Sequence, residues 1–182
     1  MSKDIIQFAR ALDFAARKHA RQRRKGDLEE PYINHLADVT RMLAVATEGR
    51  DTVLVVAGLL HDTIEDTETT FAELEMEFGR EVADLVAEVS DDKTLEKAER
   101  KRLQIETAPA KSDRAKMLKM ADKTSNLHSI IMSPPKDWSE ERKREYFEWA
   151  HDVVAGCRGV NEYLEKEFDR TWRRGLEMWG QE

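Results

Sequence analysis

The longest apolar stretch of the chain, residues 53–60, leads without a break into the polar segment HDTIED at residues 61–66. A transmembrane helix needs about 20 consecutive apolar residues, so this stretch is too short to cross a bilayer. Its hydrophobicity on every side is typical of a helix at the centre of a bundle. We therefore expect a buried helix whose C-terminal end carries ionisable side chains.

The composition favours helices throughout. Ala, Leu, Glu, Lys and Arg dominate, and no segment alternates apolar and polar residues for long. A length of 182 residues suits a single compact domain, because one core usually serves about 100–200 residues. We predict an all-α bundle that forms one domain over residues 1–182.

Apolar spacings of three and four predict a first helix from about Lys3 to Arg23. Caps and breakers predict the other helices at about 35–48, 53–62, 70–79, 82–89, 94–107, 113–132, 139–157 and 160–168. Their expected N-caps are Asp51 or Thr52, Thr69 or Thr70, Ser112 or Asp113, and Ser139. The last twelve residues are ambiguous, and their tryptophans are expected to dock on the bundle or on a partner.

Charge and cysteine content bear on the compartment and the partners. The N-terminal segment lacks the apolar region of a signal peptide, and the single Cys157 cannot form an internal disulfide, so a cytoplasmic location is expected. A net charge of −7 argues against a protein that coats nucleic acid. We expect no nucleic-acid partner and no membrane association, and we leave the oligomeric state open.

The segment at 61–66 pairs ligand-type side chains. Residues four apart share a face of a helix, so His61 lies above Glu65 and Asp62 above Asp66. An unpaired buried charge costs several kcal/mol, so such a cluster beside the most apolar helix calls for a chemical role.

A His–Asp pair alone is an incomplete metal site. His35, which follows the loop PYIN, and Asp122, in the run KMLKMADKTSNL, are candidate third and fourth ligands on neighbouring helices. Imidazole with carboxylate suits Mn²⁺, Fe²⁺ or Zn²⁺ better than Ca²⁺. An HD dipeptide is common by chance, so the prediction depends on the joint pattern.

The strings PYINH, LLHDTIEDT and KMADKTSNL resemble the HD-domain metal-dependent phosphohydrolases, specifically the (p)ppGpp hydrolase branch. The strings FAARKH, SDDKTL and WSEERKREYFEWA resemble its small single-domain members, the metazoan SpoT-homologue type. The resemblance spans about residues 8–176. It implies an HD-type bundle of roughly eight to ten helices that removes the 3′-pyrophosphate of (p)ppGpp, giving GDP or GTP and pyrophosphate.

The resemblance also implies roles for individual residues. One metal ion, typically Mn²⁺, would be bound by His35, His61, Asp62 and Asp122. The catalytic residues would be Glu65, Asp66 and Asn126. The nucleotide would contact Arg24, Lys25, Lys97, Arg142 and Tyr146. One departure concerns Thr124 and Ser125, which stand where family members often read ADKLxNL.

Three other readings stay open. The same site suits an NADPH 2′-phosphatase or another nucleotide phosphohydrolase of the HD superfamily, since these substrates also present a phosphate near a purine. A nucleic-acid or signalling-nucleotide binding module would use the basic residues 17–25 without turnover, and for it the acids Glu65 and Asp66 would be a disadvantage. A scaffold with a structural metal is the third, although such sites are commonly rich in cysteine.

Overall fold

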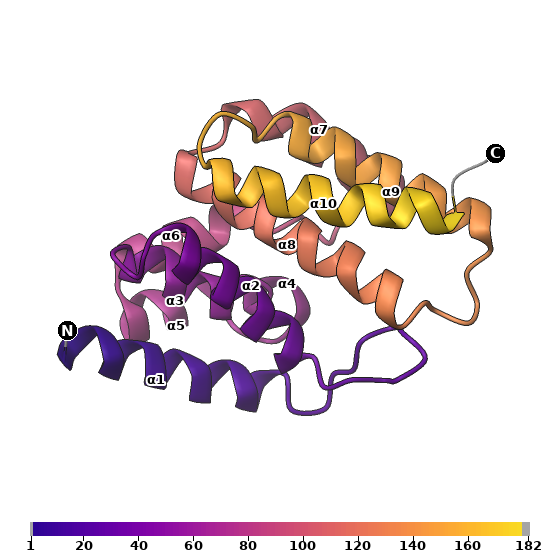
Figure 1. Cartoon of the computed structure of the whole chain (residues 1–182). Helices are drawn as coiled ribbons and strands as arrows, with labels where there is room; N and C mark the ends of the chain where they lie inside the picture. Colours follow the sequence, from indigo (N-terminus) through magenta and orange to yellow (C-terminus); the bar gives the residue numbers. More distant parts are fainter. Residues whose placement is uncertain (1, 180–182) are drawn as a thin grey trace. The chain divides into compact units, whose positions relative to one another are not determined.

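The computed structural model describes residues 2–179, and all regular elements in that range are helices (Figure 1). Ten α-helices and one short 3₁₀ helix are present among the described residues, which confirms the predicted all-α class. The chain forms two compact units. The N-terminal unit is Met1–Gln22 with Pro31–Thr94, and the C-terminal unit is Arg23–Glu30 with Leu95–Glu182.

The N-terminal unit is built around its most apolar helix. Its helices are α1 (Ser2–Lys18), α2 (Ile33–Ala46), α3 (Thr52–Leu60), α4 (Thr63–Asp66), α5 (Phe71–Phe78) and α6 (Arg80–Val89). Helix α3 packs against α1, α2 and α6, and seven of its nine residues are buried. Each large aliphatic side chain buried there contributes about 1.5–3 kcal/mol. The central position predicted for residues 53–60 is confirmed.

Helix α3 begins at a cap and approaches α2 closely. The Asp51 carboxylate accepts a hydrogen bond from the Leu54 backbone N–H at 3.1 Å, as expected of an N-cap. A Cβ added to Gly58 would lie 2.9 Å from Leu43 Cδ1. The missing side chain of Gly58 therefore lets α2 lie close to the last turn of α3.

The C-terminal unit contains α7 (Lys97–Thr107), the 3₁₀ helix η1 (Ala108–Ala110), α8 (Asp113–Met132), α9 (Glu140–Ala155) and α10 (Glu162–Trp179). Helices α8, α9 and α10 pack against one another, and α7 packs on α9 (Figure 1). The predicted caps Ser112 and Ser139 are confirmed, since each hydroxyl accepts a backbone N–H three residues on.

Two predicted boundaries are wrong. The first helix ends at Lys18 instead of Arg23, and the last continues to Trp179 instead of ending near Phe168. The extension docks on α9: the Trp179 ring lies 5.4 Å from the Phe147 ring, and the Trp172 ring stacks on His151 at 4.6 Å. Docking on the bundle, one of the two expected outcomes, is thus confirmed for the described part of the tail.

Candidate metal centre

Three predicted ligands meet in the N-terminal unit. His35 lies in the first turn of α2, His61 caps the C-terminal end of α3, and Asp62 precedes α4. One ligand atom from each lies within 4.8 Å of the other two. The Asp62 Oδ2 atom is 3.1 Å from His61 Nε2 and 3.5 Å from His35 Nε2. Both imidazoles are buried, with 3% and 4% of the residue surface exposed.

The hydrogen bonding of His61 suits metal binding. Its Nδ1 atom lies 2.9 Å from the backbone oxygen of Gly58. A carbonyl oxygen only accepts, so Nδ1 carries a hydrogen, and Nε2 is the ring nitrogen that faces Asp62. Metal-bound histidines usually donate their other ring N–H to a carbonyl or carboxylate in this way. Two imidazoles and a carboxylate fit Mn²⁺, Fe²⁺ or Zn²⁺.

Asp62 is held ionised by its neighbours. Burial alone would raise the pKa of this carboxyl, but the charge and hydrogen bonds of His61 and His35 outweigh burial and hold the pKa well below its ordinary value. The Tyr32 hydroxyl donates a further hydrogen bond to Asp62 Oδ2 at 2.6 Å. The group is therefore an anionic oxygen ligand at neutral pH.

The acidic pair lies one turn beyond the cluster, on α4. The Asp66 backbone N–H donates to the Asp62 carbonyl at 2.8 Å, which ties the short helix to the ligand. Burial raises the pKa of Glu65, and the charges of Asp62 and Asp91 raise it further. The Asp91 backbone N–H, 3.1 Å from Glu65 Oε2, and the charge of Lys93 lower it without cancelling the rise. Such a carboxyl is a stronger base than an exposed one.

Lys93 bridges the two acids, and sequence reasoning did not assign it a role in the site. Its Nζ lies 3.3 Å from Glu65 Oε1 and 2.9 Å from Asp66 Oδ1. The carboxylates raise the pKa of Lys93 despite partial burial, so the ammonium stays charged. The signal available in the sequence was the lone cation in the run SDDKTL.

The bridge predicts a pH effect. Substituting Lys93→Met removes the cation that lowers the pKa of Glu65, so that pKa rises further. If ionised Glu65 is needed for turnover, the acidic limb of the profile of kcat/KM against pH moves to higher pH. Measuring the profile for both proteins at saturating Mn²⁺ checks this, with Lys3→Met as the control. An unmoved or lowered limb would exclude Glu65 as the group titrating there.

In the C-terminal unit a chain of hydrogen bonds joins three predicted residues. Arg24 Nη2 donates to Asn126 Oδ1 at 3.1 Å, and Asn126 Nδ2 donates to Asp122 Oδ1 at 2.6 Å. The buried Lys123 ammonium donates to Asp122 Oδ2 at 2.8 Å. Asp122 as fourth ligand stays a prediction. Thr124, one of the two departures, donates its hydroxyl to the Met120 carbonyl at 2.7 Å within α8.

Aromatic rings and cations meet between α7 and α9. The Tyr146 ring lies 5.4 Å from Trp138 and 5.2 Å from Trp149. The Arg142 guanidinium lies 4.5 Å from the centre of the Trp138 ring, and Lys101 Nζ lies 4.7 Å from that of Trp149. Arg142 and Tyr146 are among the residues that the sequence predicts at the site, whereas Trp149 and Lys101 were given no role there.

Burial and the cations around Lys101 lower the pKa of its ammonium group. Burial lowers its pKa, and the charges of Lys97, Arg142 and Lys123 lower it further, while Glu145 opposes them. Lys97, predicted from the sequence, thus lies near this cluster. Lys25 is exposed in the loop that carries Arg24. Several positive groups beside aromatic rings suit an anionic ligand with a planar base.

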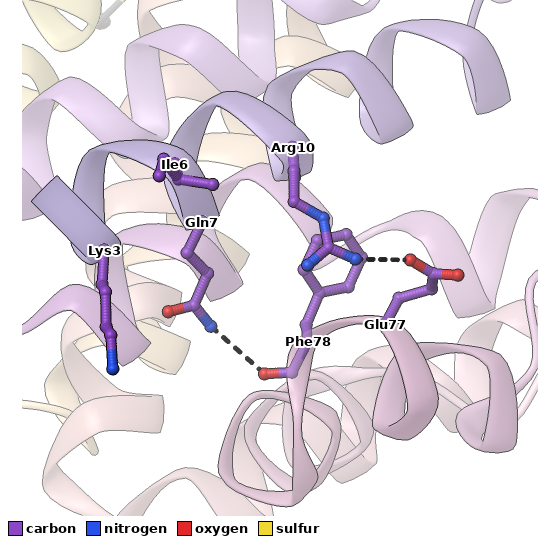
Figure 2. Close-up of a pocket in the computed structure, with 6 residues that line it drawn as sticks. All are labelled: Lys3, Ile6, Gln7, Arg10, Glu77 and Phe78. Carbon is purple, nitrogen blue, oxygen red and sulfur yellow. Dashed lines mark hydrogen bonds and ion pairs between the residues drawn. The ribbon is translucent and has the colours of Figure 1, made fainter.

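A small cavity elsewhere in the N-terminal unit contains none of the predicted site residues. It measures about 250 Å³ and lies between the start of α1 and the end of α5 (Figure 2). Gln7 Nε2 donates to the Phe78 carbonyl at 3.2 Å, and Arg10 pairs with Glu77 at 2.8 Å. Gln7, Arg10 and Glu77 thus bond within the lining, and we assign the cavity no chemistry.

Comparison with known proteins decides the family. The model of the HD domain family matches residues 11–169. The chain belongs to the HD domain family. Hydrolases of this family are metal-dependent, in keeping with the group formed by His35, His61 and Asp62.

Close relatives cover nearly the whole chain. The chain is 51% identical to the guanosine-3′,5′-bis(diphosphate) 3′-pyrophosphohydrolase MESH1 of Xenopus tropicalis, over 94% of this chain and 96% of the relative. It is 50% identical to the human protein of the same name, over 97% and 99% of the two chains. A solved structure of a metazoan ortholog of SpoT that hydrolyzes ppGpp matches with a TM-score of 0.89 and 46% identity, over 92% of this chain and 94% of that chain.

None of the helices within residues 2–179 is both long and apolar enough to span a membrane. The cytoplasmic location predicted from the sequence stays a prediction.

Proposed function

We propose that this HD-domain protein is a metal-dependent hydrolase that removes the 3′-pyrophosphate of guanosine (p)ppGpp alarmones. The observation that carries the proposal is the group of two buried imidazoles and one carboxylate directly before the acids of α4. The chain is 51% identical to a guanosine-3′,5′-bis(diphosphate) 3′-pyrophosphohydrolase over almost the full length of both proteins. This similarity supports the proposed substrate.

The N-terminal unit would carry the water chemistry. His35, His61 and Asp62 would hold the ion, for which we propose Mn²⁺, with Asp122 as fourth ligand. A divalent ion held there would lower the pKa of a nearby water toward neutrality and would offset negative charge on the attacked phosphate. Glu65, with its raised pKa, would orient the water and accept its proton. Asp66 would act with Glu65.

The reaction breaks one bond and forms another. Water adds to the phosphorus bonded to the ribose 3′ oxygen, the bond from that phosphorus to the 3′ oxygen breaks, and the 3′ oxygen takes up a proton. The products are pyrophosphate and either GDP or GTP. General acid–base groups contribute about 10²–10⁴-fold to such proton transfers, which is the role proposed for the α4 acids.

The C-terminal unit would bind the nucleotide. The proposed alarmone substrate carries clustered negative charge, which the carboxylates of α4 would repel. Cations must therefore offset the charge of the substrate. Arginine meets phosphate with a planar fork of donors, lysine as a point charge, and an aromatic ring offers a face to a base. We assign these contacts to Arg24, Lys25, Lys97, Arg142 and Tyr146, and the orientation of the reacting phosphate to Asn126.

A nucleotide panel tests the proposal. Purified protein with Mn²⁺ is incubated separately with ppGpp, pppGpp and NADPH, each with and without EDTA. We expect GDP or GTP and pyrophosphate from the alarmones, and no turnover with EDTA. Dephosphorylation of NADPH with no alarmone turnover would favour the 2′-phosphatase reading. Turnover that EDTA leaves unchanged would contradict the metal-dependent mechanism.

A further inference from the structure

Two side chains just beyond the end of α1 are linked by hydrogen bonds to Asp66, one of the acids of α4. Gln22 Nε2 donates to Asp66 Oδ2 at 2.9 Å. A carboxylate only accepts, so the amide nitrogen faces Asp66 and the amide oxygen faces the other way. That oxygen lies 2.5 Å from His19 Nδ1. Because the amide oxygen also only accepts, Nδ1 of His19 carries a hydrogen.

His19 is also linked to the ligand cluster, because its ring stacks on Tyr32 and Tyr32 hydrogen-bonds to Asp62. The His19 ring stacks on Tyr32, with ring centres 5.1 Å apart and planes 24° from parallel. The Tyr32 hydroxyl in turn donates to Asp62 Oδ2 at 2.6 Å. His19 is 2% exposed, and its Nε2 has no hydrogen-bond partner among the described residues. The ring is thus oriented by one hydrogen bond and one stack.

The backbone fixes these three residues relative to one another. The Gln22 N–H donates to the His19 carbonyl at 3.0 Å, and the Tyr32 N–H donates to the Gln22 carbonyl at 3.1 Å. All three residues belong to the N-terminal unit, as do both carboxylates. The three residues therefore hold fixed places beside the two carboxylates.

We propose that His19, Gln22 and Tyr32 form a positioning chain that sets the orientation of Asp62 at one end and Asp66 at the other. The inference rests on the proposed function, since it takes Asp62 as a metal ligand and Asp66 as a catalytic acid. Neighbours that hydrogen-bond to metal ligands typically change metal affinity or activity 10–100-fold when removed. None of the three touches the reacting atoms in this scheme.

The positioning of Asp62 by Tyr32 is tested by measuring metal binding in the absence of substrate. Tyr32→Phe keeps the ring that stacks on His19 and removes only the hydroxyl on Asp62. Calorimetric titration of the metal-free full-length protein with Mn²⁺ is expected to give a Kd about 10–100-fold higher than wild type. Tyr163→Phe, the same chemical change on α10, is the control and keeps the wild-type Kd. A wild-type Kd for Tyr32→Phe would overturn the positioning of Asp62.

The Gln22 end is tested by kinetics. Gln22→Leu removes both hydrogen bonds of the amide, so kcat is expected to fall about tenfold or more, with KM and the Mn²⁺ Kd within about twofold of wild type. Arg21→Gln, an exposed neighbour, is the control. A kcat equal to that of wild type would overturn the positioning of Asp66. A tenfold rise in KM in place of the fall in kcat would show that Gln22 has a binding role instead.

Two substitutions of His19 separate its contacts. His19→Phe keeps a ring against Tyr32 but has no donor for Gln22, so it should lower kcat and preserve the Mn²⁺ Kd. His19→Asn offers an amide N–H near the place of Nδ1 but no ring, so it should preserve more of kcat and raise the Kd. If both variants changed the two quantities in parallel, His19 would act through the fold alone and the chain would be refuted.

A spectroscopic signature keeps the inference testable if a variant fails to fold. The ¹⁵N resonances of His19 in the wild-type protein should report a hydrogen on Nδ1, and an Nε2-protonated ring would contradict the chain. The positioning chain and the proposed function can be refuted separately. Mn²⁺ binding without alarmone hydrolysis by wild type would refute the proposed function, while the titrations would still decide the positioning of Asp62.

Discussion

Substituting Asp62→Asn is expected to abolish metal binding and alarmone hydrolysis together. The amide keeps the size of the side chain but removes the anionic oxygen that lies within 3.5 Å of both imidazoles. A bound divalent ion supplies several kcal/mol of charge stabilisation in the transition state, and 1.36 kcal/mol corresponds to a factor of ten. We therefore expect kcat/KM to fall about 1,000-fold or more, measured over a range of ppGpp concentrations in the presence of Mn²⁺.

The control for this variant is Asp84→Asn. Asp84 is exposed on α6 and pairs with Arg80 at the surface, where an ion pair contributes little to stability. This change should leave both the Mn²⁺ stoichiometry and kcat/KM at wild-type values. Normal Mn²⁺ binding by Asp62→Asn would remove Asp62 from the ligand set.

Glu65→Gln is expected to separate metal binding from turnover. The substitution removes the proposed base but none of the three clustered ligand atoms. We expect kcat to fall about 100- to 10,000-fold, the usual contribution of a general base, while the Mn²⁺ Kd stays within about twofold. The matched control is Glu68→Gln, because Glu68 is exposed and lies two residues after Asp66. We expect this variant to keep full activity.

The stability of the Glu65 variant follows from the sign of the pKa shift. A carboxyl whose pKa is raised in the folded state contributes stability below its ordinary pKa, and this contribution is lost as pH rises from that value through the raised pKa of the folded state. At neutral pH the neutral Gln side chain should therefore leave Tm unchanged or slightly higher. A joint loss of Mn²⁺ binding, Tm and activity would instead favour the structural-metal scaffold.

The helical architecture was predictable because periodicity, caps and breakers agree along most of the chain. Asp51, Ser112 and Ser139 each cap the helix they were expected to cap. The metal group was predictable in part, since His61 and Asp62 end a buried helix and the PYINH string supplies His35. Their convergence required the close packing of α2 on α3, which no local pattern reports.

The sequence prediction failed where tertiary hydrogen bonds overrule helix propensity. Residues 19–23 continue the helical pattern of α1, yet the helix ends at Lys18. Beyond it, the Gln22 side chain bonds to Asp66, and the Gln22 carbonyl accepts from Tyr32. Departures from local preference are expected at functional positions, and this one coincides with the proposed positioning chain.

Roles carried by packed side chains were also out of reach. Lys101 has the pattern of a solvated helix residue, but two of the cations near it, Lys123 and Arg142, and the Trp149 ring come from segments distant in sequence. Lys93 likewise gains its role from two acids that lie 27 and 28 positions before it. Pairings of this kind depend on tertiary structure, whereas caps and apolar periods are local.

The central claim is that one divalent ion binds at His35, His61 and Asp62. The most direct measurement is an anomalous difference map from crystals of the full-length protein grown with Mn²⁺ and recorded near the manganese absorption edge. We predict one strong peak within bonding distance of the two Nε2 atoms and an Asp62 carboxylate oxygen. A map with no peak at this group, or with its strongest peak elsewhere in the molecule, would contradict the account.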